Sequence, residues 1–198
     1  MGRPSKPMIS REGAIQAALE ILDEEGLDKL SLQAVARRMG VRAPSLYYHF
    51  ENKSELMAGV ARLILSRPPP SRINRQKDWK ESMVDLCKWA RKTMLKHPNA
   101  APLLLEVYPE QVMLPTYEFW LRQYKVPAKQ KMVIMEGLEK ITFGAVLLGA
   151  MSRARGQEAF PPDIDKSRFP ALAEAIKSNR KGEEGLFEEI LRRYLSTF

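Results

Sequence analysis

Residues 31–53 read SLQAVARRMGVRAPSLYYHFENK, and this stretch decides the fold of the N-terminal part of the chain. Ser31 can cap a short helix that ends at Gly40, because a serine side chain accepts a hydrogen bond from a free N–H of the first turn. Pro44 suits the first turn of a second helix over 43–50, where its missing N–H would have no partner. Two short helices joined by a tight turn that contains glycine are typical of a helix-turn-helix, whose second helix enters the major groove of DNA.

The stretch lies between two longer helical patterns. A helix is expected over 11–25, because apolar residues recur there at helical spacing and Ser10 offers a cap. Asn52 and Glu55 form a variant of the capping box, which opens a linking helix over 53–66.

The rest of the chain also has helical periodicity. The proline run 68–70 marks a boundary, so we assign residues 1–66 to a helix-turn-helix DNA-binding domain and residues 67–198 to a larger helical domain. Period-two alternation is absent, which argues against a sheet and indicates the all-α class. Further helices are expected at 78–96, 101–107, 109–124, 128–156, 170–178 and 183–197.

The charge of the chain is positive and unevenly placed. The net charge is +8 and the pI is about 9.6, which favours an acidic partner. Residues 29–53 contain five basic residues and one acidic residue, Glu51, whereas the charged residues of 12–25 are all acidic. We interpret a second basic stretch, 72–96, as the solvated face of a helix.

Other classes of protein are disfavoured by what the sequence lacks. The longest apolar run, 141–151, is shorter than the roughly 20 residues of a membrane span, and no apolar signal core precedes residue 11, so we expect a cytoplasmic protein without a membrane partner. Cys87 is the only cysteine, which excludes an intramolecular disulfide, and its apolar neighbours favour a buried packing thiol. We find no glycine-rich phosphate loop and no metal-ligand cluster, so we expect no cofactor, no metal site and no enzyme activity.

The outward side of the second short helix carries the candidate DNA contacts. Side chains there can hydrogen-bond to base edges or touch thymine methyl groups, and neighbouring cations can approach phosphates. We expect Tyr47 and Phe50 to fill the core instead, since both fall on the apolar side with Leu46. The outward residues are Ala43, Pro44, Ser45, Tyr48 and His49, and the cations are Arg37, Arg38, Arg42 and Lys53.

The same residues carry a family resemblance. The segments LSLQAVARRMGV at 30–41, PSLYYHF at 44–50 and NK at 52–53 contain the signature L-Y-x-H-(F/V)-x-N-K and resemble the TetR repressor family. The resemblance covers residues 10–65, and beyond them His97-Pro98 and FPALA at 169–173 are similar to the tetracycline-repressor branch. It implies an all-α homodimer that binds a near-palindromic double-stranded DNA operator and releases it when a small-molecule effector enters the larger domain.

The resemblance also implies a role for individual residues. Tyr48 and Lys53 would anchor phosphates. Gln33 and Ser45 would contact base edges, and Pro44 would contact a methyl group.

Two positions depart from the tetracycline-type members. Leu32 and Ala43 stand where those members have polar residues that contact DNA, so the operator sequence does not transfer to this chain. Arg42, at the start of the reading helix, can compensate by contacting a guanine or a phosphate. The position of His49 after a tyrosine favours a DNA-backbone contact over a buried hydrogen-bonding role.

The implied effector would bind in residues 67–198, which we assign to ligand binding and dimerisation. Aromatic and methionine side chains there can surround a cavity and favour a small, largely apolar ligand, although the plainer interpretation is that most of them pack the core. The resemblance implies that small residues within 137–152 and the apolar face of 186–195 form an intersubunit helix bundle, and the alternative is that these faces are buried within one subunit. The candidate pocket residues are Trp89, Met94, Tyr108, Tyr117, Trp120, Met135 and Phe143.

These patterns together predict a DNA-binding transcriptional regulator. We expect a homodimeric repressor that a small, largely apolar molecule releases from its operator. The alternative is an activator or a ligand-independent regulator with the same DNA-binding domain, and nothing in the residues separates these. A helical enzyme that carries this domain is a remote alternative, since no catalytic constellation is recognisable.

Overall fold

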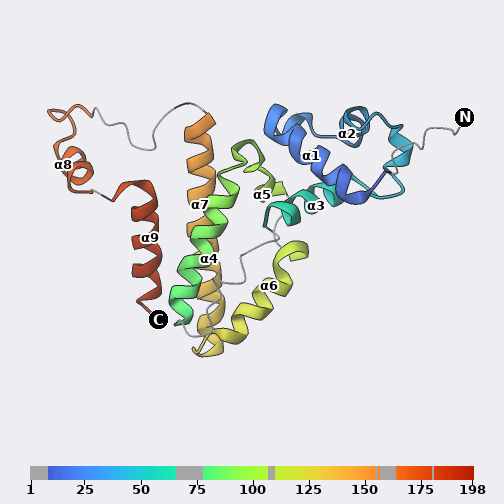
Figure 1. Cartoon of the computed structure of the whole chain (residues 1–198). Helices are drawn as coiled ribbons and strands as arrows, with labels where there is room; N and C mark the ends of the chain where they lie inside the picture. The colour runs from blue at the N-terminus through green and yellow to red at the C-terminus, as the bar shows by residue number, and fades with distance from the viewer. Residues whose placement is uncertain (1–8, 66–77, 107–109, 155, 157–163, 180) are drawn as a thin grey trace, which may run out of the picture. The chain divides into compact units, whose positions relative to one another are not determined.

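The regular elements of the computed structural model are all helical (Figure 1). The all-α class is therefore confirmed. The structure describes residues 9–65, 78–106, 110–154, 156, 164–179 and 181–198. The proline run 68–70 lies outside these residues, and within them no helix is both long enough and apolar enough to span a membrane.

The helices begin and end close to the residues that periodicity and capping predict. The predicted helices at 11–25 and 170–178 match in full, and the long helices after residue 77 differ from prediction by no more than two residues at either end. The helices are α1 (Arg11–Glu25), α2 (Leu32–Arg38), α3 (Lys53–Leu65), α4 (Trp79–Met94), α5 (Leu103–Glu106), α6 (Glu110–Gln123), α7 (Ala128–Ala154), α8 (Pro170–Ser178) and α9 (Gly182–Leu195), with 3-10 turns η1 (Leu27–Lys29), η2 (Ala43–Ser45) and η4 (Pro98–Ala100).

The chain separates into two compact units. One contains Met1–Ser66 and Asn99–Leu114, and the other contains Arg67–Pro98 and Pro115–Phe198. Residues 99–114 therefore belong to the same compact unit as the N-terminal residues, which helical periodicity alone does not predict.

The capping residues act where the sequence places them. Ser10 Oγ accepts from the Gly13 N–H at 2.9 Å, and Ser31 Oγ accepts from the Ala34 N–H at 3.0 Å. Gly26 ends α1 with a φ of +84°, a left-handed region that side chains with a Cβ rarely adopt. These local bonds give partners to backbone N–H groups that have none within the helix, and so they set where the helices begin.

Helix α1 is the centre of the first unit, because it packs against both α2 and α3. Its small residues Ala14 and Ala18 are fully buried, which allows the helices to approach closely. Leu56 and Val60 of α3 are also fully buried. Helix α2 contributes Val35 to this core and packs against η2. Residues 43–50, which we call the reading segment, therefore rest on the same apolar centre.

The segment 43–50 is not the regular α-helix that we expected. Its N–H groups bond to carbonyls three residues back, Leu46 to Ala43 at 3.0 Å and His49 to Leu46 at 2.9 Å, which is the 3-10 pattern. Only Phe50, bonded to the Leu46 carbonyl at 3.0 Å, makes the four-residue α-helical bond at the end of the segment. So short a piece gains little from helix propagation, and the burial of Leu46 and Phe50 maintains its helical path instead.

The core of the second unit forms where α4, α7 and α9 pack against one another (Figure 1). Each helix presents an apolar stripe at helical spacing, and Trp120 and Tyr124 join the same cluster. The Tyr124 ring packs against Trp79, with ring centroids 4.9 Å apart and planes tilted by 40°, and its hydroxyl donates to Met83 Sδ at 3.1 Å. The largest contributors from the three helices are Met83, Val84, Ile134, Leu138, Phe187, Leu191 and Leu195.

Cys87 lies inside this cluster, which confirms the packing role expected from its neighbours. Burial disfavours the thiolate and raises the pKa of the Cys87 thiol to about 11. At pH 8 only about a thousandth of the thiol is then ionised, and the thiolate is the reactive form.

We predict that Cys87 in the folded protein reacts with a disulfide reagent such as dithionitrobenzoate far more slowly than a free thiol at pH 8. Following the released chromophore with and without urea provides the measurement, and the rate should rise sharply across the unfolding transition. Rapid modification in buffer would show that the thiol is accessible and that the packing role is wrong.

Candidate nucleic-acid interface

The residues predicted to contact DNA gather on the first unit, and most of them are open to solvent. Tyr48 is the extreme case, with 90% of its surface exposed. Such exposure of a large aromatic side chain contributes nothing to folding, so it marks a surface available for a partner. Exposed with it are Gln33, Arg42, Pro44 and Lys53, and half-buried are Ala43, Ser45 and His49.

The reading segment has one buried side and one open side. Leu46 and Phe50 are 0% and 1% exposed, so both side chains point into the core. Pro44 and Tyr48 are both exposed. Tyr47, which we expected in the core, is 51% exposed, so that expectation was wrong. It follows Leu46 by one residue, and a step of about 100° turns it away from the core.

Leu32 has a structural explanation for its departure from the family pattern. It is only 4% exposed and belongs to the core of the first unit. A side chain so buried cannot reach a base edge without leaving that core. Gln33, the next residue, is exposed instead and is the polar residue that the start of α2 offers to a partner.

Arg11 joins the end of the reading segment to α1 and α3, a role that the sequence analysis missed. Its guanidinium donates to the His49 carbonyl, forms an ion pair with Glu55 Oε1 at 2.7 Å, and lies 4.6 Å from the centre of the Phe50 ring. The sequence suggests only a basic N-terminal tail, because the partners of Arg11 lie about forty residues away along the chain. These contacts make Arg11 a positioning residue for the reading segment.

Glu55 completes this arrangement and modifies the predicted capping box. Asn52 Oδ1 accepts from the Glu55 N–H at 2.9 Å, as expected, but Glu55 Oε2 accepts the reciprocal bond from the Glu51 N–H, at 2.7 Å, rather than from Asn52. The hydrogen bond from Glu51 and the neighbouring Arg11 guanidinium together lower the pKa of the Glu55 carboxyl below its ordinary value.

The cations near the reading segment divide into two groups. Arg38, which we expected to approach phosphates, is held on α1 by a forked pair of hydrogen bonds to Glu24, at 3.0 and 2.6 Å. These bonds lower the pKa of the Glu24 carboxyl. Arg37, Arg42 and Lys53, by contrast, are exposed and form no ion pair with another described residue. Their charge is available to an anionic partner such as a phosphate backbone.

The predicted pocket residues of the second unit have mixed surroundings. Trp120 and Met94 are 6% and 1% exposed, so both pack inside the unit. The hydroxyl of Tyr117 donates to Glu139. Tyr108 lies outside the described residues. The remaining candidates, Trp89, Met135 and Phe143, are half-buried.

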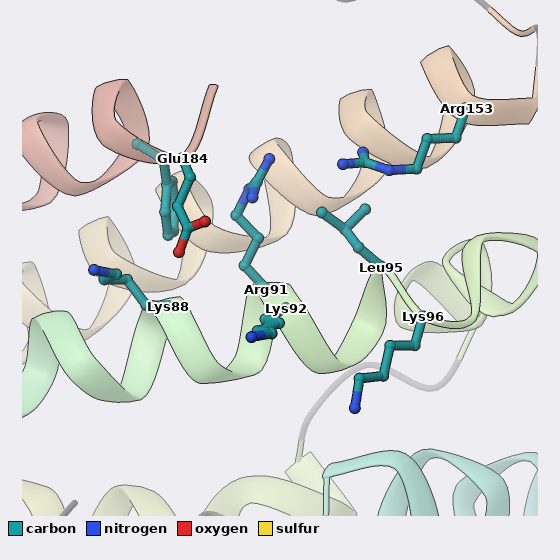
Figure 2. Close-up of a pocket in the computed structure, with 8 residues that line it drawn as sticks. Lys88, Arg91, Lys92, Leu95, Lys96, Arg153 and Glu184 are labelled. Carbon is teal, nitrogen blue, oxygen red and sulfur yellow. The ribbon is translucent and has the colours of Figure 1, made fainter. Parts of the chain in front are cut away.

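The second unit contains a hollow of about 240 Å³, bordered mainly by basic side chains (Figure 2). None of the predicted pocket residues lines it. The sequence analysis missed it because the basic stretch 72–96 was interpreted as a solvated helix face, whereas Arg91 within that stretch is only 7% exposed. The lining residues are Lys88, Arg91, Lys92, Leu95, Lys96, Arg153, Glu184 and Phe187.

We predict that Glu55→Gln destabilises the protein at neutral pH and that this difference shrinks in acid. Because the folded-state pKa of Glu55 is lowered, its contribution is present above the unfolded-state value near 4.5 and is lost as the pH falls through the folded-state value. Urea unfolding of both proteins between pH 7 and pH 3 measures the difference. Glu12→Gln, at an exposed glutamate of α1, is the control, and an equal difference at all pH values for Glu55→Gln would contradict the role given to its charge.

Comparison with known proteins agrees with this geometry. Residues 14–60, which include α2 and the reading segment, match the family model of bacterial regulatory proteins, tetR family. Tetracycline repressor protein class D of Escherichia coli is 27% identical over 173 residues, which cover 85% of this chain and 79% of that protein.

Two solved structures have the same fold over most of their length. A single-residue variant of TetR from Acinetobacter baumannii AYE, in complex with minocycline, has a TM-score of 0.77 at 21% identity and covers 96% of this chain and 94% of its own. BioQ with its double-stranded DNA operator has a TM-score of 0.63 at 23% identity and covers 86% of this chain and 98% of its own. In its matched segment and in its relatives, this chain is similar to the tetR family of bacterial regulatory proteins, and it shares the fold of these two structures.

Proposed function

We propose that the protein is a ligand-responsive DNA-binding repressor that acts as a homodimer on a double-stranded operator. The observation that carries this proposal is the reading segment, in which Leu46 and Phe50 are anchored in the core while Tyr48 projects with 90% exposure. A folded unit that presents an aromatic hydroxyl beside exposed cations is suited to phosphate contact. BioQ, which shares the fold, has been solved with its DNA operator.

The DNA contacts divide by chemistry. Tyr48, Lys53 and Arg42 are exposed donors, which suits them to phosphate oxygens and so to affinity without sequence preference. Gln33 can form paired hydrogen bonds with an adenine, and Ser45 can bond to either kind of base edge.

The remaining candidates complete the reading surface. Pro44 and Ala43 offer apolar contact to a thymine methyl group, and His49 offers a backbone contact. Leu32 is buried, so this chain lacks a polar contact at that position and reads an operator of its own. We assign DNA binding to residues 1–66 and effector binding with dimerisation to residues 67–198.

Dimerisation is supported by apolar side chains that the second unit leaves open to solvent. Leu148 and Met151 of α7 are 67% and 51% exposed, and their three-residue spacing places them on one side of the helix. Gly144 precedes Leu148 by one turn, and a Cβ built there meets open space. Ile190 of α9 is 44% exposed. Pairing such faces between two copies would give two reading segments the spacing of successive major grooves.

Release from DNA requires an effector that binds two conformations unequally. A small molecule with an apolar body, held in the second unit, would favour the conformation whose reading segments no longer match the operator. The TetR variant from Acinetobacter baumannii AYE, which has this fold, has been solved in complex with minocycline. A regulator of this kind acts in the cytoplasm, where its operator lies.

We predict that the protein binds DNA from the region upstream of its own gene with a strong dependence on salt. Fluorescence anisotropy at several salt concentrations tests this, because each phosphate neutralised steepens the decline of affinity with salt. Lys53→Gln should reduce the slope of the logarithm of affinity against the logarithm of salt concentration by about 1. Lys177→Gln, which removes an exposed lysine of α8, should leave it unchanged. A slope that Lys53→Gln does not alter would contradict the phosphate role.

Recognition of the base sequence of the operator is tested by a different pair of variants. Tyr48→Phe removes one hydroxyl and should weaken binding to operator and to scrambled DNA alike, by about fivefold. Gln33→Ala should lose about tenfold on the operator and much less on scrambled DNA. Equal losses on both DNAs for Gln33→Ala would show that Gln33 does not read bases.

We predict that Leu148→Glu shifts the protein from dimer to monomer, because a charge at the centre of an apolar interface is costly to bury. Light scattering after size exclusion measures the mass, and circular dichroism checks that the helices persist. Lys129→Glu, at an exposed position near the start of α7, is the control. A Leu148→Glu protein that remains dimeric would exclude this face as the interface.

A further inference from the structure

The hollow in the second unit has walls from three helices that come from distant parts of the chain. It has a volume of about 240 Å³ and lies where residues of α4, α7 and α9 meet. Figure 2 shows Arg91 reaching from α4 and Arg153 reaching from α7 toward the same space, with Glu184 on α9 beside them. Leu95 and Phe187 supply apolar wall, so a ligand there would meet both charge and hydrocarbon.

The charge around the hollow is predominantly positive. Five basic residues and one acidic residue line it. Two further carboxylates close by, Glu183 and Glu188, form ion pairs with Arg91 and Lys88. Lys92 and Lys96 form no ion pair with any described residue, so the lining retains an uncompensated positive charge.

Arg91 is the residue that most clearly lacks a partner atom. It is only 7% exposed, donates through Nη2 to Glu183, and lies 5.3 Å from the centre of the Phe187 ring. Its Nε is buried and has no hydrogen-bond partner among the described residues. Glu183 and the Phe187 ring therefore hold this guanidinium in place at the wall of the hollow.

Helix α7 carries a glycine, Gly149, where side chains that border the hollow pack against it. A Cβ on Gly149 would lie 2.9 Å from Arg153 Nη1 and 3.1 Å from Glu183 Oε1. Arg153 in turn donates to the Gly149 carbonyl at 2.9 Å and lies 3.5 Å from Glu183 Oε2. The absent side chain thus allows two arginines and their shared carboxylate to meet at the wall of the hollow.

We propose that this hollow binds a small organic anion, a carboxylate on an apolar body, which is the effector of the protein. Arg91 and Arg153 would hold the carboxylate, since a guanidinium presents planar, charged donors that match its two oxygens. Leu95 and Phe187 would contact the apolar body. The effector role rests on the repressor function proposed above, whereas the binding of the anion does not.

Benzoate is a suitable probe, and benzamide is its uncharged counterpart of nearly equal shape. Calorimetric titration of the full-length protein, without DNA and at matched ionic strength, should show benzoate binding at least about tenfold more tightly than benzamide. Equal binding of the two, or no binding of benzoate, would overturn the anion site.

Two variants locate the site. Arg91→Lys keeps the charge beside Glu183 but replaces the planar, forked guanidinium with a single ammonium group, and it should weaken benzoate by about tenfold. Arg153→Gln, at a side chain that is 43% exposed, should weaken benzoate without affecting folding and so serves if Arg91→Lys does not fold. Arg193→Gln, at a side chain of α9 that is 80% exposed, is the matched control and should bind benzoate as the parent does. Losses of equal size in all three would place the binding elsewhere.

The last measurement separates this proposal from the function on which it rests. Benzoate should release the parent protein from its operator, and it should do so less effectively with Arg153→Gln at the same concentration. Binding of benzoate without release from DNA would overturn the effector role. Failure of the ligand-free protein to bind any operator would count against the repressor function, while the calorimetric result on the anion would stand by itself.

Discussion

The DNA-binding unit depends on the burial of Leu46 and Phe50. The segment that contains them has mostly 3-10 hydrogen bonds and would not keep a helical path in isolation. Burial of each such side chain contributes about 1.5–3 kcal/mol to holding the segment on the core. Tyr48, which lies between these two residues in the sequence, is 90% exposed. One apolar anchor therefore both stabilises the segment and presents its outer side to a partner.

Electrostatic contacts then sort the basic residues of this unit by role. Arg38 is committed to Glu24 on α1, and Arg11 is committed to the His49 carbonyl and to Glu55. Both stabilise the arrangement of helices from which the reading segment projects. Arg37, Arg42 and Lys53 remain exposed, so their positive charge can attract a phosphate backbone.

The second unit bears out one expectation from the sequence and reverses another. Trp120, a candidate ligand contact, is packed into the core, as the plainer interpretation of the aromatic residues expects. Arg91, in a stretch interpreted as a solvated face, is instead buried beside Glu183 and Phe187. A guanidinium is tolerated there because it is paired and lies on an aromatic ring. The hollow beside it is therefore charged on one side and apolar on another, which suits a ligand that has an anionic group on an apolar body.

The sequence by itself determined the features that depend on near neighbours. Helix ends follow from bonds within three or four residues, such as Ser10 to Gly13 and Ser31 to Ala34, so capping and periodicity were sufficient to predict them. The reading motif could be recognised for the same reason. Tertiary structure alone decided which residues 38 positions apart would meet, as Arg11 and His49 do, and it alone placed Tyr47 outside the core and Arg91 inside it. Local pattern does not encode such contacts, because they arise only when separate helices pack and exclude water between them.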